Sequence, residues 1–159
     1  MKELSIHPIA REHLDAVAKI WHDGWHEAHD HLVPKYPPSE RSVEQFQKRL
    51  VSSFGRTRVA SLSGVPVGLV EVESAEIAQL FVNSSARRLG MGKALLRDAE
   101  KQLKKASYLK AWLTVVDGNH RACDFYEKCN WVRTGELVRP SNATRSVNQL
   151  RLWRFEKTL

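Results

Sequence analysis

Residues Gln79–Leu96 read QLFVNSSARRLGMGKALL. The apolar start is typical of a strand, the middle is a basic turn with two glycines, and the end returns to helical spacing. A helix that begins here exposes backbone N–H groups without partners, and its aligned dipoles add partial positive charge. Gly90 and Gly92 let phosphate oxygens approach the backbone, and Arg87 and Arg88 add cationic donors. The stretch therefore predicts a site for a phosphate-bearing ligand rather than a plain strand–helix connection.

The spacing of the two glycines separates this turn from two common phosphate-binding motifs. A Walker A loop needs the longer spacing G-x-x-x-x-G-K-[ST]. The dinucleotide motif G-x-G-x-x-G would need a glycine at position 95, where this chain has leucine.

Hydrophobic periodicity extends the pattern on both sides of this junction. It predicts helices over 11–28, from a cap at Ser39 or Ser42 to Leu50, over 93–105 and over 119–128. The predicted strands cover 4–9, 58–62, 65–73, 77–82, 111–116 and 150–155. The order is β-α-α-β-β-β-α-β-α-β, and the passage from residue 77 to 116 predicts a parallel, right-handed crossover. With 159 residues, the chain 1–159 is expected to form a single domain.

A second segment, Asn119–Trp131, reads NHRACDFYEKCNW. Together the two segments resemble motifs of the GCN5-related N-acetyltransferase (GNAT) family. Arg87-x-x-Gly90-x-Gly92 is similar to that family's pyrophosphate loop, [Q/R]-x-x-G-x-[G/A], and the second segment is similar to N-x-x-A-x-x-[F/L]-Y-E-[K/R]-x-G-F. Asn130 stands where the family has glycine, and asparagine tolerates the left-handed conformation that a helix end requires.

The resemblance extends to the element order and covers nearly the whole chain. It implies an α/β fold with a mixed, mostly antiparallel twisted sheet, a central parallel β-α-β unit and helices on both faces. It also implies acetyl-CoA as the acyl donor. The coenzyme-binding positions that match the family's pattern are Leu80, Phe81, Val82, Arg87, Arg88, Leu89, Gly90, Met91, Gly92, Lys93 and Asn119.

Acetyl transfer to an amine needs a neutral amine, a base, donors for the carbonyl oxygen and an acid for the leaving thiolate. By the family's pattern the acid is Tyr126, which could instead be a packing residue. Glu76 is the candidate base, because some family members carry a glutamate six residues before the position of Val82. Strand alternation places Glu76 on the same face as Leu80 and Val82. The alternatives are Glu71, Glu73 and a chain of water molecules.

Histidines crowd the end of the first long helix, at positions 22, 26, 29 and 31. His22 and His26 have a spacing that can bind a transition metal, but the segment lacks the H-E-x-x-H order, and we expect no metal. In the resembled family the first two helices and their loop form much of the acceptor pocket. The candidate acceptor contacts are therefore Trp25, His26, His29 and Tyr36; alternatively the tryptophan is core and the histidines face solvent.

Composition bears on compartment and partners. No apolar run reaches the roughly 18–20 residues that span a bilayer, and residues 1–17 lack an apolar signal-peptide core. We therefore expect a cytoplasmic protein without membrane association. The net charge is +7, but the basic residues are scattered and not interleaved with aromatic residues, so nucleic-acid binding is not expected.

The resemblance implies an N-acetyltransferase whose primary-amine acceptor attacks the thioester directly. The alternative is a non-catalytic acyl-CoA-binding or regulatory module with the same fold, and the presence of Tyr126 and Glu76 favours the enzyme. The acceptor remains open among small amines, polyamines, aminoglycosides, amino acids and protein amino groups. Many relatives of this fold pair, so a homodimer is one expected assembly.

Overall fold

A computed structural model describes residues 2–33, 38–140 and 149–159. The strands of this part of the chain are β1 (Leu4–Pro8), β2 (Thr57–Leu62), β3 (Val65–Glu73), β4 (Glu76–Val82), β5 (Lys110–Val116), β6 (Val132–Pro140) and β7 (Gln149–Thr158). The helices are α1 (Leu14–His29), α2 (Val43–Ser52), α3 (Met91–Lys105) and α4 (His120–Lys128). Short 3-10 turns join several of them, including Arg11–His13 before α1 and Ser84–Ala86 before α3.

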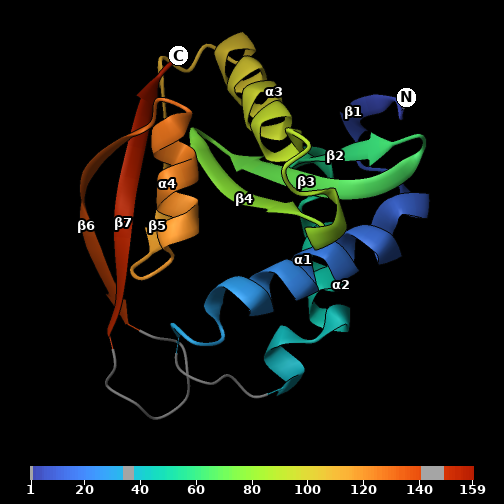
Figure 1. Cartoon of the computed structure of the whole chain (residues 1–159), viewed down its shortest axis with the longest axis horizontal. Coiled ribbons are helices and arrows are strands. Elements are labelled where there is room, and N and C mark those ends of the chain that lie inside the picture. Colours follow the sequence, from blue (N-terminus) through green and yellow to red (C-terminus); the bar gives the residue numbers. More distant parts are fainter. Residues whose placement is uncertain (1, 34–37, 141–148) are drawn as a thin grey trace.

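The strands form one seven-stranded sheet in the order β1-β2-β3-β4-β5-β7-β6 (Figure 1). Every neighbouring pair is antiparallel except β4 and β5, which are parallel and flank the crossover through α3. The predicted fold class, a mostly antiparallel mixed sheet around a parallel β-α-β unit, is confirmed.

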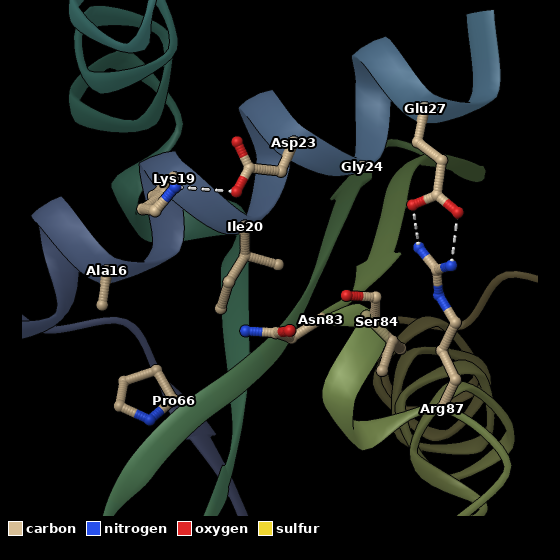
Figure 2. Close-up of a pocket in the computed structure, with 11 residues that line it drawn as sticks. Ala16, Lys19, Ile20, Asp23, Gly24, Glu27, Pro66, Asn83, Ser84 and Arg87 are labelled. Carbon is tan, nitrogen blue, oxygen red and sulfur yellow. Dashed lines mark hydrogen bonds and ion pairs between the residues drawn. The ribbon is translucent and has the colours of Figure 1, made fainter.

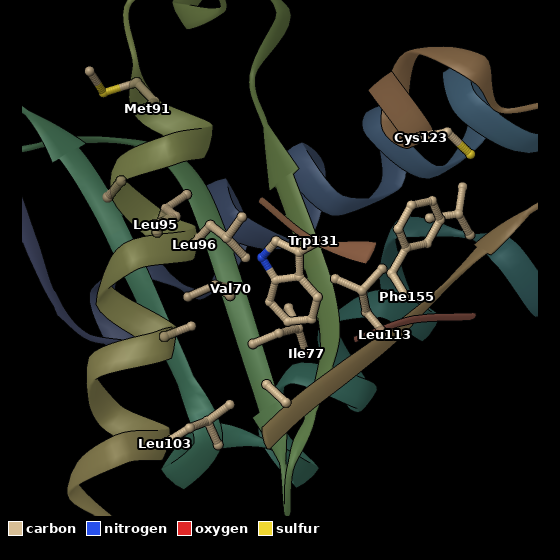
Figure 3. Packing of buried hydrophobic residues seen from close by; sticks show 14 of the residues in the cluster. Val70, Ile77, Met91, Leu95, Leu96, Leu103, Leu113, Cys123, Trp131 and Phe155 are labelled. Atoms are coloured by element: carbon tan, nitrogen blue, oxygen red, sulfur yellow. The ribbon is translucent and has the colours of Figure 1, made fainter. Parts of the chain in front are cut away.

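Helices cover both faces of the sheet, and each face has its own hydrophobic core. Alternation along β2 shows the division: Val59 packs with α1 and α2, whereas its neighbour Ala60 packs on the side of α3. Figure 3 shows the second core, in which the α3 residues Leu95 and Leu96 lie among strand residues and Trp131. Burial of these apolar faces fixes how α1 and α3 sit across the ends of β4, where the site is built.

Strand β6 was missed by the sequence analysis. Its sequence, VRTGELVRP, contains a glycine, a proline and three charged residues, a composition that is unfavourable for a strand. Among the described strands it lies at the edge of the sheet and pairs with β7 alone, with a register shift between Arg133 and Gly135. An edge position tolerates these residues because one side of the strand forms no ladder.

A β-bulge interrupts β4 and changes which face Glu76 occupies. Glu71 lies opposite Gln79 but Val72 lies opposite Ile77, so Ala78 is an extra residue in β4. Ile77 therefore joins Leu80 and Val82 on the α3 side. Glu76 consequently lies on the other face, the side of α1 and α2. The expectation that Glu76 shares a face with Leu80 and Val82 was wrong, because strict alternation does not hold across a bulge.

Strands β4 and β5 pair only at their beginnings. Their register contains the single pair Glu76 and Trp112, where the Trp112 amide donates to the Ala75 carbonyl at 3.1 Å. Figure 1 shows the two strands diverging from that point toward their carboxyl ends. The middle of the sheet is therefore open between the β4–α3 turn and the β5–α4 turn.

Candidate active site

The open edge of β4 presents backbone groups without a strand partner. The Asn83 amide donates to the Val67 carbonyl at 2.7 Å, which identifies a hydrogen-bonded pair of the β3–β4 ladder. The ladder alternates, so the N–H and C=O groups of Leu80 and Val82 point toward β5. No β5 residue lies in register with them. These groups can therefore bind a ligand that runs along β4.

The β4–α3 turn ends in a helix N-terminus without a side-chain cap. Gly90 is the N-cap residue, with φ 81°, and its carbonyl accepts the first helical bond from Ala94 at 3.0 Å. Within the described chain, no acceptor is bonded to the amides of Met91, Gly92 and Lys93. A Cβ on Gly90 would meet nothing within 4 Å, so the space in front of these amides is open. Free donors and a positive helix end form an anion-binding site.

Some side chains around this turn form ion pairs and others are exposed. Arg87 donates to Glu27 of α1 through both terminal nitrogens, at 2.6 and 2.7 Å (Figure 2). Arg88, Leu89 and Lys93 are exposed, and neither cation forms a salt bridge with a residue that the structure describes. The buried Met91 can offer only its backbone. The pairing of Arg87 with Glu27 was not predicted, since no sequence pattern links residues 60 positions apart.

A cavity of about 200 Å³ lies beside this turn, between α1 and the end of β4 (Figure 2). Its walls come from Ala16, Lys19, Ile20, Asp23, Gly24, Glu27, Pro66, Val82, Asn83, Ser84 and Arg87. Neither Glu76 nor Tyr126 lines it. The cavity thus adjoins the anion-binding turn and not the candidate catalytic residues.

The second motif forms α4, on the other side of the open edge. The Asn119 side chain caps this helix by accepting from the Ala122 amide at 3.3 Å. Asn130 has φ 68°, which confirms that asparagine adopts the left-handed conformation here. Phe125 approaches the start of α3, where its ring lies 3.4 Å from the position of a Cβ on Gly92.

Tyr126 projects from α4 into aromatic surroundings. Its ring centre lies 5.1 Å from Phe125, 6.2 Å from Trp131 and 6.1 Å from Phe155. Burial raises the pKa of Tyr126. Its hydroxyl therefore remains protonated at neutral pH, and it has no hydrogen-bond partner among the described residues. Such a hydroxyl can donate a proton or a hydrogen bond to a ligand atom.

Glu76 lies on the opposite face, in a group of three carboxylates. Burial raises the pKa of Glu76; the nearby Glu73 and Glu71 raise it further, whereas Arg139 and Arg154 lower it. A carboxylate with a raised pKa accepts protons more readily near neutral pH. Glu71 is more deeply buried, with 7% exposure, and an Arg56 nitrogen lies 3.4 Å from it. Burial raises the pKa of Glu71 as well.

The predicted acceptor residues cluster at the end of α1. The Trp25 ring meets His26 edge-on and His29 at a tilt, with both ring centres at 5.1 Å, and the Arg41 guanidinium lies 5.0 Å over its ring. Tyr36 lies outside the described residues.

His26 and His29 differ in the hydrogen bonds that their ring nitrogens form. The His26 ring faces Asp30 at 2.8 Å through Nδ1 and the Arg41 carbonyl at 2.8 Å through Nε2. Both nitrogens face acceptors, so His26 ties α1 to the start of α2. His29 donates from Nδ1 to the Trp25 carbonyl at 3.0 Å. Burial lowers the pKa of His29, so its neutral form is favoured, and Nε2 can accept a hydrogen bond from a substrate donor such as an amine.

The described part of the chain contains no group of three or more His, Cys, Asp or Glu residues that could hold a metal ion. None of its helices has the length and apolar character needed to cross a membrane.

Comparisons with known proteins agree with this geometry. The model of a family described as "Acetyltransferase (GNAT) family" matches residues 14–131. A GCN5-related N-acetyltransferase structure from Rhodopseudomonas palustris superposes with a TM-score of 0.76 at 20% identity, covering 100% of this chain and 98% of that one. The PaiA N-acetyltransferase of Thermoplasma acidophilum, solved in complex with coenzyme A, superposes with a TM-score of 0.70 at 19% identity, covering 99% of both chains.

A third structure is similar to the same extent. The ribosomal-protein-alanine N-acetyltransferase of Brucella melitensis has a TM-score of 0.76 at 17% identity, covering 98% of this chain and 99% of that one. At these identities the superpositions establish a shared fold.

Proposed function

Because the chain belongs to the GNAT acetyltransferase family, we propose that it transfers an acetyl group from acetyl-CoA to a primary amine. The observation that carries this proposal is the uncapped N-terminus of α3, which the turn 83–90 joins to the open edge of β4. One feature suits a diphosphate and the other suits an extended pantetheine arm. The PaiA N-acetyltransferase named above binds coenzyme A on the same fold.

In this proposal the coenzyme spans from the start of α3 to the middle of the sheet. The diphosphate binds the amides of Gly90–Lys93, with Arg87 and Arg88 as cationic donors. The arm runs along β4, where the backbone groups of Leu80 and Val82 pair with its amides, as a strand would. Phe81, Leu89 and Asn119 complete the family's set of positions. Asn119 acts there through the position of α4, because its side chain caps that helix.

The acyl group would then lie where β4 and β5 diverge. Tyr126 would approach it from the face of the sheet that carries α3, and Glu76 from the face that carries α1 and α2. The amine nitrogen attacks the thioester carbon and loses a proton to Glu76, directly or through water. The C–S bond breaks, and the sulfur takes a proton from the Tyr126 hydroxyl, which solvent restores. Trp25, His26, His29 and Tyr36 are proposed to shape the acceptor side, with His26 acting through its tie to α2.

The test is thiol release from acetyl-CoA with a panel of amines that includes polyamines, aminoglycosides, amino acids and peptide N-termini. Turnover with one class supports the enzyme. Coenzyme binding without turnover across the panel favours the non-catalytic module instead.

The role of Glu76 has its own test in the pH profile of kcat/KM. A base must be ionised, so kcat/KM falls as the pH drops through the pKa of the base, which gives the profile an acid limb. Because the pKa of Glu76 is raised, this fall begins at a higher pH than for an ordinary glutamate. Glu76→Gln removes this acid limb of the profile and lowers the rate. Glu73→Gln removes a neighbouring charge that raises the pKa of Glu76, so it should keep the limb but move it to lower pH. A Glu76→Gln variant with the wild-type profile would transfer the role to Glu71, Glu73 or water.

A further inference from the structure

Glu27 binds two arginines that come from opposite sides of the open edge. Its carboxylate accepts both bonds from Arg87, at 2.6 and 2.7 Å, and a third from Arg121 at 3.4 Å. Arg87 belongs to the β4–α3 turn and Arg121 to the first turn of α4. One carboxylate on α1 thus joins the two strand–helix junctions that flank the proposed coenzyme site.

The end of α1 lies across these junctions by packing as well as by charge. A Cβ on Gly118, in the β5–α4 turn, would lie 2.7 Å from the Leu32 side chain, which follows α1. On the other side, Gly24 lies against the Phe81 ring of β4. These contacts hold this end of α1 against both junctions, so side-chain rotation is the simplest way for the Glu27 carboxylate to leave Arg87.

The bidentate contact uses the part of Arg87 that would bind a phosphate. A guanidinium presents its terminal N–H groups as a fork that fits a carboxylate or a phosphate in the same geometry. The hydrogen bonds from Arg87 lower the pKa of Glu27, so the carboxylate is charged at neutral pH. A phosphate oxygen that takes the same fork must displace this carboxylate.

We propose that the Glu27 carboxylate competes with the diphosphate of the coenzyme for Arg87. It holds Arg87 in the free protein and yields it on binding, so it weakens coenzyme affinity and shortens the lifetime of the complex. This inference rests on the proposed function, specifically on Arg87 as a diphosphate ligand. It assigns to α1 a part in coenzyme release that lies outside the two sequence motifs.

Removing the competitor should strengthen binding. The apparent Kd equals the intrinsic value divided by the fraction of protein in which Arg87 is available, and an exposed ion pair shifts that fraction only modestly. Glu27→Gln is therefore expected to lower the Kd for coenzyme A about two- to fivefold. Acetyl-pantetheine lacks the diphosphate, so its Kd should stay unchanged.

The matched control is Asp23→Asn. Asp23 lies one turn earlier on α1 and contacts Lys19 at 2.9 Å and His22 at 2.8 Å; within the described chain no hydrogen bond or ion pair joins it to Arg87 or Arg121. It removes the same charge at a similar exposure, so an equal gain in affinity for both variants would overturn the competitor role in favour of a general charge effect.

Calorimetric titration of four proteins with coenzyme A decides the matter: wild type, Glu27→Gln, Arg87→Ala and the double variant. We expect Glu27→Gln to bind more tightly than wild type, and to have no effect in the Arg87→Ala background. An unchanged or higher Kd for Glu27→Gln, with Arg87→Ala still weakening binding, overturns this inference alone. An unchanged Kd for Arg87→Ala itself overturns the phosphate role of Arg87 on which the inference rests.

Discussion

Helices α3 and α4 each follow a strand at the open middle of the sheet, α4 after the short turn 117–119 and α3 after the longer turn 83–90, yet their N-termini differ. At α4, the Asn119 side chain accepts from Ala122, and the His120 amide donates to the Gly118 carbonyl at 2.9 Å. At α3, Gly90 provides no side chain and the next three amides have no acceptor in the described chain. Two helix dipoles therefore point into the same region. Among the described residues, α4 leaves one first-turn amide without an acceptor, that of Arg121, whereas α3 leaves three. We assign coenzyme binding to α3 and chemistry to α4, through Tyr126.

The largest effect is expected from giving α3 a cap of its own. In Gly90→Asp, a carboxylate would accept from the first amides of α3 and repel the diphosphate. Two amides that the new carboxylate occupies can no longer donate to the diphosphate, and this loss should raise the Kd for coenzyme A about 100-fold.

Calorimetry measures this change, and circular dichroism confirms the fold. Gly64→Asp is the control, because Gly64 likewise has a positive φ, 82°, and faces open space, but lies in the β2–β3 turn. A Kd for Gly90→Asp close to that of Gly64→Asp would break the comparison.

Tyr126→Phe tests the other half of the comparison. It keeps the aromatic packing with Phe125, Trp131 and Phe155 but deletes the proton donor. Acid catalysis contributes about 100- to 10,000-fold in general, but a thiolate leaves without much help, so we expect kcat to fall about 10- to 100-fold.

The Kd for coenzyme A and the thermal stability of Tyr126→Phe should match wild type. Thiol-release kinetics beside calorimetry separate the two quantities. Turnover within twofold of wild type would make Tyr126 a packing residue.

Arg87→Ala should have a smaller effect on binding than Gly90→Asp. It removes one charge-assisted contact, and the backbone amides of α3 remain, so the Kd for coenzyme A should rise about tenfold. The Kd for acetyl-pantetheine should not change. Equal losses for both ligands would show that Arg87 acts elsewhere than at the diphosphate.

Asn119→Ala should affect stability and not affinity. Loss of a helix cap lowers the free energy of unfolding by about 1 kcal/mol. Urea denaturation measures this, and Asp124→Ala, at an exposed position of the same helix, serves as the control. A weaker affinity for coenzyme A without loss of stability would mean that Asn119 contacts the coenzyme.

The sequence predicted local features of the site better than long-range ones. The α3 junction was predictable because its strand, its glycines and its basic residues are contiguous. The left-handed Asn130 was predictable from its place at a helix end. In contrast, the bulge at Ala78 depends on how β3 and β4 pair, so the face of Glu76 could not follow from alternation.

Two other features depend on tertiary contacts in the same way. Strand β6 is specified by its pairing with β7 and by its edge position, not by its own composition. The Glu27–Arg87 pair arises because α1 packs across the sheet next to the β4–α3 turn. Periodicity within a single segment contains no information about either contact.

The most direct test of the assignment is amide chemical-shift mapping of ¹⁵N-labelled protein, with coenzyme A and acetyl-pantetheine titrated in parallel. Shifts that depend on the diphosphate are those seen with the first ligand and not with the second. We predict that they concentrate on Gly90–Lys93 at the start of α3 and are much smaller at His120–Ala122, where only the loosened contact between Arg121 and Glu27 contributes. Diphosphate-dependent shifts at the start of α4, with none at α3, would contradict the account.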